Sequence, residues 1–333
     1  MSWYSKIYIF ERKYRKKHPV TGFLLKMAMN APLIMNFIIM AYSYYVYIWL
    51  ICLTCLTSSI QITIYLIIFH AILFMMFWSL IRSLITSTAR VPNDYFVMIF
   101  HFERLFTHRN MKSNPIQFQI EFHVDEEVDR KLKEITPMKD GKYQPDESSV
   151  DQIREQKKIL EDFAKSRKLM LFEVDKYNRL RYCYICRLIK PDRSHHCSSC
   201  GFCVLKFDHH CPWINKCISN SNYKYFLLYL FYGCCLIIWI FLSSSECLIR
   251  YFISEIAISL LEITMIILLM LICIVFGFYP FGELMIYHIS GNANADYNIG
   301  IYENFYAALG WGFWGIPINT SVSNGLKFPL RYR

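Results

Sequence analysis

Long apolar runs are the feature that most constrains the fold of this chain. Two of them, roughly Pro32–Leu56 and Ser59–Ile85, lie near its start, and only Thr57 and Ser58 separate them. Each run exceeds the ~20 residues that an α-helix needs to cross a bilayer. Because the link is so short and uncharged, the two runs are expected to form a helical hairpin in a membrane.

Two further apolar runs, roughly Tyr225–Ser245 and Ile263–Ile289, follow a charged central region. The expected fold class is therefore a multi-pass α-helical membrane protein with four transmembrane helices. Four spans place both termini on one side of the membrane. The N-terminal segment and the central region are rich in Lys and Arg, so the positive-inside rule predicts that the central region and both termini are cytosolic.

The formal net charge is +10. A basic balance suits nucleic acid or anionic lipid. The apolar runs favour the lipid bilayer, and the basic segments outside them lack interleaved base-stacking aromatics. No nucleic-acid partner is expected.

The central region is expected to hold a strand at Gln117–Val124, where apolar and polar residues alternate. Residues 125–149 carry charges, prolines and a glycine, which is typical of a loop. An amphipathic helix is predicted over Val150–Leu171, because apolar residues recur between charges there. No internal repeat is evident in the sequence.

Seven of the 13 cysteines lie between Cys183 and Cys217, together with four histidines. In a reducing compartment such a cluster predicts metal binding rather than disulfides. Zinc takes four Cys or His ligands, so two zinc ions would use eight of these eleven side chains and spare three. Spacing alone leaves open which three. The other cysteines lie in or beside apolar runs and are expected to be small packing residues: Cys52, Cys55, Cys234, Cys235, Cys247 and Cys273.

A carboxylate, an imidazole and a thiol occur together in Asp208-His209-His210-Cys211. A thiol activated by a histidine that a carboxylate orients is the arrangement of an activated nucleophile. The following Pro212 and Trp213 would stiffen and shield such a site, and Trp213 is the expected substrate-binding residue.

The block resembles the DHHC-type protein S-acyltransferase (palmitoyltransferase) family. The matching residues run Cys183-x2-Cys186-x9-His196-Cys197-x2-Cys200-x2-Cys203-x4-Asp208-His209-His210-Cys211-Pro212-Trp213-x3-Cys217. The approach Lys190-Pro191-x-Arg193-Ser194-His195, the later Asn220 and Asn222, and the four-span layout are also similar to that family.

The resemblance implies a ligand set and site roles. One structural zinc would take Cys183, Cys186, His196 and Cys203, and the other Cys197, Cys200, His210 and Cys217. Cys211 would be the nucleophile, activated by His209 and Asp208. In the tail, Gly300-x3-Asn304-x4-Leu309-Gly310 also resembles the family, and Asn304 is expected to make buried hydrogen bonds that dock the tail.

Two stretches depart from the family pattern. Where the family often has Asp-Pro-Gly after the second span, this chain reads Thr86-Ser87-Thr88-Ala89-Arg90-Val91-Pro92. Where it often has Thr-Thr-x-Glu after the fourth span, the nearest match is Ala293-Asn294-Ala295-Asp296, which keeps an acid and loses both hydroxyls.

The hypothesis is a protein S-palmitoyltransferase that moves a long-chain acyl group from acyl-CoA to Cys211 and then to cysteines of substrate proteins at the cytosolic membrane face. The co-substrate would be palmitoyl-CoA, and an accessory subunit is compatible with the sequence. The membrane would be an endomembrane (Golgi or ER) or the plasma membrane. Two alternatives stay open: a catalytically silent zinc scaffold and a membrane-anchored RING-like ubiquitin ligase.

The expected division of the chain follows from these assignments. It comprises a basic cytosolic N-terminus (1–29), the first two spans (30–85), a cytosolic insertion (86–182), the zinc domain (183–217), the last two spans (225–289) and a cytosolic tail (290–333).

Overall fold

The structure is a computed structural model that describes residues 19–92, 127–136, 138–139, 142–143, 149–253, 256–278, 297, 300–320 and 324–326. The chain divides into two compact units, which are described separately below. The first unit comprises Met1–Thr88, His209–Asn324 and Phe328–Arg333, and the second comprises Ala89–Asp208 and Gly325–Lys327.

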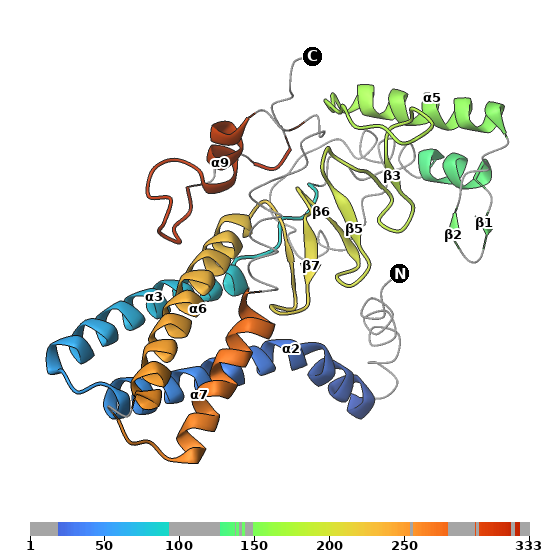
Figure 1. Cartoon of the computed structure of the whole chain (residues 1–333). Helices are drawn as coiled ribbons and strands as arrows, with labels where there is room; N and C mark the ends of the chain where they lie inside the picture. Colours follow the sequence, from blue (N-terminus) through green and yellow to red (C-terminus); the bar gives the residue numbers. More distant parts are fainter. Residues whose placement is uncertain are drawn as a thin grey trace, which may run out of the picture. The chain divides into compact units, whose positions relative to one another are not determined.

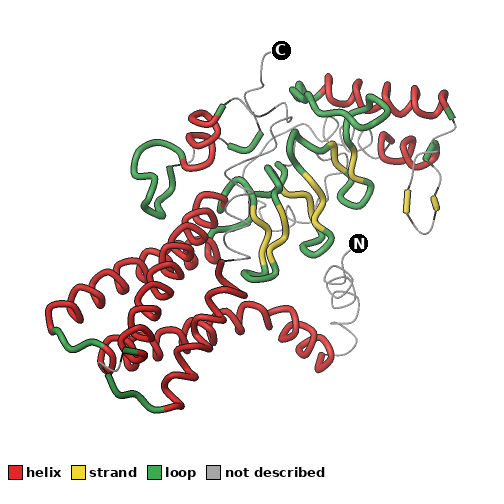
Figure 2. The backbone as a smooth tube through the Cα atoms, in the orientation of Figure 1, coloured by secondary structure: helices red, strands yellow, loops and turns green. Residues whose placement is uncertain are grey.

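Apolar helices form most of the first unit (Figures 1 and 2). Helix α2 (Pro19–Tyr45) continues as the π-helical segment η1 (Val46–Cys55), and α3 (Ser59–Ile85) and α6 (Tyr223–Phe252) follow. Among the described residues, these three are long and apolar enough to cross a membrane. The first three predicted spans are therefore present as helices, and α3 has the predicted bounds.

The fourth predicted span is only partly described. Helix α7 (Leu260–Ile272) leads into the π-helical segment η3 (Cys273–Phe278), and the apolar stretch Leu260–Val275 is shorter than the other three helices. The rest of the predicted range Ile263–Ile289 lies outside the described residues. A fourth crossing therefore stays a prediction.

Helices α3 and α6 pack along each other, and polar contacts join them near the C-terminal end of α6. Glu246 on α6 accepts hydrogen bonds from Gln61 (2.8 Å) and Tyr65 (2.5 Å) on α3, and from Arg250 one turn along α6 (2.7 Å). Inside a membrane a carboxylate persists when charged and polar partners surround it. These hydrogen bonds hold Gln61 and Tyr65 of α3 against Glu246 of α6.

Two of the cysteines expected to be packing residues instead form a disulfide. Cys55, at the end of η1, is bonded to Cys247 on α6, and the two Cα atoms are 5.6 Å apart. Both side chains are fully buried. The bond joins the end of the first span to the third span. The sequence does not predict this pairing, because the two cysteines lie in separate apolar runs.

Three short antiparallel hairpins make up the Cys-rich block. They are β3–β4 (Tyr182–Cys183 with Leu188–Ile189), β5–β6 (His195–Cys197 with Phe202–Val204) and β7–β8 (His209–Cys211 with Lys216–Ile218). The hairpins pair Cys183 with Leu188, Cys197 with Phe202 and Cys211 with Lys216, so each follows the previous one by 14 residues in an identical register. The expectation of no internal repeat is therefore wrong.

The second unit also contains a helical layer. Helix α5 (Val150–Ser166) buries Leu160 and Phe163, which confirms the predicted amphipathic helix, although it ends before the predicted Leu171. Residues 127–134 form a helix, and β1 (Met138–Lys139) pairs with β2 (Lys142–Tyr143), so the loop expected over 125–149 is wrong. Pairs of opposite charge four residues apart, such as Asp129 with Lys133, stabilise the short helix. The strand predicted at Gln117–Val124 lies outside the described residues.

Side chains of α6 hold the C-terminal tail of the first unit. Lys224 at the start of α6 donates hydrogen bonds to the Phe313 carbonyl (3.3 Å) and the Thr320 hydroxyl (2.7 Å), and Tyr232 donates to the Gly315 carbonyl (2.7 Å). Asn304 lies in α9 (Ile301–Leu309) with an exposed side chain. The expected burial is therefore not seen, and a role of Asn304 in docking the tail stays a prediction.

The disulfide leads to a test by thiol counting. In denatured protein, prior reduction should add two cysteines that react with a maleimide-polyethylene glycol reagent. Cys55→Ser should abolish this gain, because it frees Cys247 before any reductant is added. Cys52→Ser, which changes a buried neighbouring thiol, should keep the gain of two. A wild-type chain that gains none on reduction would contradict the bond.

Candidate functional site

The first Cys/His group has the spacing of a metal site. Cys183, Cys186, His196 and Cys203 bring their ligand atoms within 4.8 Å of one another. The His196 Nδ1 atom lies 3.6 Å from Cys183 Sγ and 3.2 Å from Cys186 Sγ. Zn–S bonds of roughly 2.3 Å and Zn–N bonds of roughly 2.0 Å place tetrahedral ligands about 3.5 Å apart. Three sulfurs and one nitrogen at this spacing fit zinc.

The local fold of the hairpins creates these ligand positions. In each of the first two turns the fourth residue donates its backbone N–H to the sulfur of the first, at 3.4 Å for Cys186 to Cys183 and 3.3 Å for Cys200 to Cys197. The second predicted ligand set divides between the two units: Cys197 and Cys200 belong to the second, and His210 and Cys217 belong to the first. A metal site shared by these four residues stays a prediction.

The side chains of His209, His210 and Cys211 in β7 alternate between the two faces of the strand. Successive side chains of a strand point to opposite sides, so His209 and Cys211 share one face and His210 occupies the other. His210 pairs directly with Cys217 on β8, and its Nδ1 atom lies 3.5 Å from Cys217 Sγ. This distance is the one expected between two ligands of the same metal ion. His209, in contrast, lies on the same face of β7 as Cys211.

Several hydrogen bonds attach the β7–β8 hairpin to the apolar helices of the first unit. Lys216 donates to the carbonyl of Leu84 (2.7 Å) and to that of Thr86 at the end of α3. A cation at these free carbonyls suits the negative end of the helix dipole. This contact lies in the stretch that lacks the family's Asp-Pro-Gly, so Lys216 supplies an anchor there.

Asn222 closes the other end of the hairpin. Its side chain is fully buried, accepts a hydrogen bond from the Ser219 backbone (2.8 Å) and donates one to the Cys217 carbonyl (3.0 Å). It directly precedes α6, so it couples the end of β8 to the start of the third span. These contacts give a structural reason for an asparagine at position 222.

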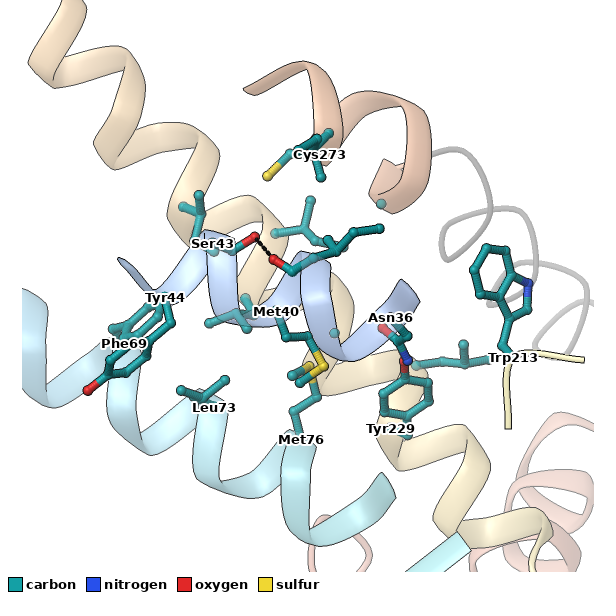
Figure 3. Close-up of a pocket in the computed structure, with 18 of the residues that line it drawn as sticks. Asn36, Met40, Ser43, Tyr44, Phe69, Leu73, Met76, Trp213, Tyr229 and Cys273 are labelled. Carbon is teal, nitrogen blue, oxygen red and sulfur yellow. Dashed lines mark hydrogen bonds between the residues drawn. The ribbon is translucent and has the colours of Figure 1, made fainter. Parts of the chain in front are cut away.

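An apolar cavity of about 140 Å³ lies among the helices of the first unit (Figure 3), and Cys211 is one of the residues that line it. The buried thiol of Cys211 and the half-exposed ring of Trp213 line it next to Phe226. His209 packs edge-on against Phe226, with ring centroids 5.4 Å apart. From there α6 lines the cavity as far as Ile240, which lies about 21 Å further along the helix.

Two polar side chains interrupt the apolar wall near Trp213 (Figure 3). Asn36 on α2 donates a hydrogen bond of 2.9 Å to the Tyr229 hydroxyl on α6. The sequence predicts neither residue, and of the cavity wall it predicts only Cys211 and Trp213. Runs that are apolar on all sides do not show which face points inward, so only the helix packing identifies these residues.

In the second unit, Lys206 lies two residues before Asp208 and close to Arg193. The pKa of the half-buried Lys206 is lowered to about 8 by burial and by the Arg193 charge, and Asp208 opposes this effect. Two neighbouring cations are typical of a position that receives an anionic group. Asp208 itself directly precedes β7 in the chain.

Comparisons with known proteins identify the family of this chain. The family model of the DHHC palmitoyltransferase matches residues 176–299, which include the three hairpins from β3 onward. "Palmitoyltransferase spe-10" of Caenorhabditis elegans is 39% identical over 100% of this chain and 92% of its own length. "Palmitoyltransferase ZDHHC15" of Homo sapiens and of Rattus norvegicus are each 30% identical over 90% of this chain and 82% of their length.

Identity at this level, over nearly the full length of the relatives, shows the family. The chain belongs to the DHHC palmitoyltransferase family, and its activity is that of a protein S-palmitoyltransferase.

Proposed function

We propose that Cys211 is the nucleophile that carries the acyl group between acyl-CoA and the substrate protein. The observation that carries this proposal is its position: a buried thiol at the wall of an apolar cavity, on the face of β7 opposite to the metal-ligand pair His210 and Cys217. The family implies acyl-CoA and membrane-associated protein substrates.

His209 is the proposed general base. Residues 209 and 211 lie about 6.6 Å apart along the strand and on the same side, so an imidazole can reach the thiol. In the first step His209 takes the Cys211 proton, the thiolate attacks the thioester carbonyl carbon, and the CoA thiolate leaves with the proton from His209. In the second step a substrate thiol gives its proton to His209 and attacks the acyl-enzyme, and Cys211 recovers its proton. Asp208 is proposed to orient His209.

Two structural zinc ions are proposed for the two Cys/His groups. A bound zinc ion with four protein ligands supplies folding energy and keeps no open position for substrate. The residues themselves set the backbone of the hairpins: His210, fixed opposite Cys217, determines which way its neighbours His209 and Cys211 point.

The cavity beside Cys211 is proposed to hold the acyl chain, with Trp213 in contact with substrate at its entrance. An apolar wall along α6 suits a hydrocarbon chain, since each buried CH2 contributes about 0.8 kcal/mol relative to water. Lys206 and Arg193 are proposed to meet the CoA phosphates.

The Cys-rich block and both termini are proposed to face the cytosol, as the positive-inside rule predicts. The disulfide between Cys55 and Cys247 supports this orientation, because it joins the spans at the ends remote from the block, and disulfides persist in oxidising compartments. In the proposed layout the segments 1–29, 86–182 and 290–333 share the cytosolic side. A reduced Cys55 in native membranes would contradict this orientation.

Cys211→Ser tests the nucleophile. The variant should lose hydroxylamine-sensitive labelling by a palmitoyl-CoA analogue, because a serine hydroxyl is a far weaker nucleophile than a thiolate. Its zinc content should equal that of the wild type. Cys52→Ser, another buried cysteine, serves as the control and should label normally. Persistent labelling of Cys211→Ser would refute the assignment, and loss of zinc would identify Cys211 as a ligand.

His209→Gln tests the general base. Autoacylation at neutral pH should fall by about 10²- to 10⁴-fold, the usual contribution of a positioned base. The deficit should shrink as pH rises, because hydroxide then removes the thiol proton without His209. The exposed His195, changed to Gln, is the matched control and should keep the wild-type rate. A deficit that is equal at all pH values would contradict this role.

Ile240→Trp tests the acyl-chain cavity. Ile240 lines the end of the cavity wall remote from Cys211, whereas Ile238 on the same helix is 46% exposed. The larger ring should lower autoacylation by a 16-carbon acyl-CoA relative to a 12-carbon one by about tenfold or more, because several CH2 groups lose their burial. Ile238→Trp should leave this ratio unchanged. An unchanged ratio in both variants would place the chain elsewhere.

A further inference from the structure

The third hairpin repeats the turn geometry of the two metal-binding hairpins. The first residue of each turn is a cysteine, at Cys183, Cys197 and Cys211, each pairing with the residue five positions later. The fifth residue of each turn has left-handed backbone, with φ values of 55°, 78° and 49° at Arg187, Gly201 and Asn215. Cys211 therefore occupies the same position as two proposed metal ligands.

The difference between the hairpins lies in the fourth residue of the turn. In the first two hairpins it is Cys186 or Cys200, whose backbone N–H donates to the first sulfur and whose side chain joins the same metal group. In the third hairpin it is Ile214, which is only 2% exposed. A cysteine pair at this spacing chelates one ion, and the pair is incomplete in the third turn.

The third hairpin does have the cross-strand histidine and cysteine of the second hairpin. Its cross-strand pair His210 and Cys217 corresponds to His196 and Cys203 in the second hairpin, with identical register. The backbone is thus that of a complete zinc-binding hairpin, and one side chain of the turn has changed. Ile214 packs into the apolar cluster that contains Cys211 and Ile218.

We propose that the β7–β8 turn is a zinc knuckle in which Ile214 replaces the second cysteine, and that Ile214 is the positioning residue that keeps Cys211 free for acyl transfer. A single thiolate holds a metal ion weakly, whereas a second sulfur on the same turn binds intramolecularly and raises the affinity by chelation. Ile214 acts through Cys211 and has no role of its own in the acyl transfer. This inference rests on the proposed role of Cys211 as nucleophile.

The test restores the missing ligand in the full-length, detergent-solubilised protein. Ile214→Cys should bind one added Cd²⁺ ion beyond the wild type, seen as extra thiolate-to-cadmium charge-transfer absorbance in the presence of a phosphine reductant. Its autoacylation should become at least tenfold more sensitive to Zn²⁺ and should recover on brief treatment with a chelator. Neither change is expected in Ile214→Ser, which loses the same apolar side chain and gains no sulfur.

Ile214→Cys combined with Cys211→Ser should lose the extra Cd²⁺ absorbance, because the chelating partner is gone. If Ile214→Cys fails to fold, Ile214→His provides the second ligand as an imidazole and should show the same gain in Zn²⁺ sensitivity. A folded Ile214→Cys that binds no more Cd²⁺ than Ile214→Ser would overturn the inference. The absorbance needs no catalysis, so this result is separate from the labelling of Cys211→Ser, which tests the proposed function.

Discussion

Across β7 and β8, His210 and Cys217 face each other with 3.5 Å between nitrogen and sulfur. This contact sets the orientation of the neighbouring side chains. Because side chains alternate along a strand, a fixed His210 directs His209 and Cys211 to the other face. Two adjacent histidines of the same motif thus acquire different surroundings. One lies in a metal-ligand group, and the other packs against Phe226 at the wall of the apolar cavity.

The same hairpin is attached to helices with the composition of membrane spans. Lys216 holds the end of α3 and Asn222 holds the start of α6, so the turn that contains Cys211 lies directly on the apolar helices. In the proposed mechanism, the thiol of Cys211 meets the CoA thioester at this junction while the acyl chain enters the apolar cavity. The position of the thiol, and not the motif alone, supports this proposal.

The long spans could be predicted because a run of apolar residues beyond about 20 has few other solutions. The ligand set came from the resemblance, since spacing leaves three of eleven side chains undecided. The 14-residue repeat was missed because the three hairpins share register and turn geometry more than residues: Ile189 and Tyr182 stand where later hairpins have Cys and His. The disulfide was missed because Cys55 and Cys247 meet only after the helices pack.

Native mass spectrometry of the wild-type protein after incubation with palmitoyl-CoA tests the central claim most directly. The account predicts a species with two zinc ions and one hydroxylamine-labile palmitoyl group, which peptide mapping assigns to Cys211. Palmitate on another cysteine of the block, or loss of zinc when the acyl group is added, would contradict a free nucleophile beside two closed metal sites.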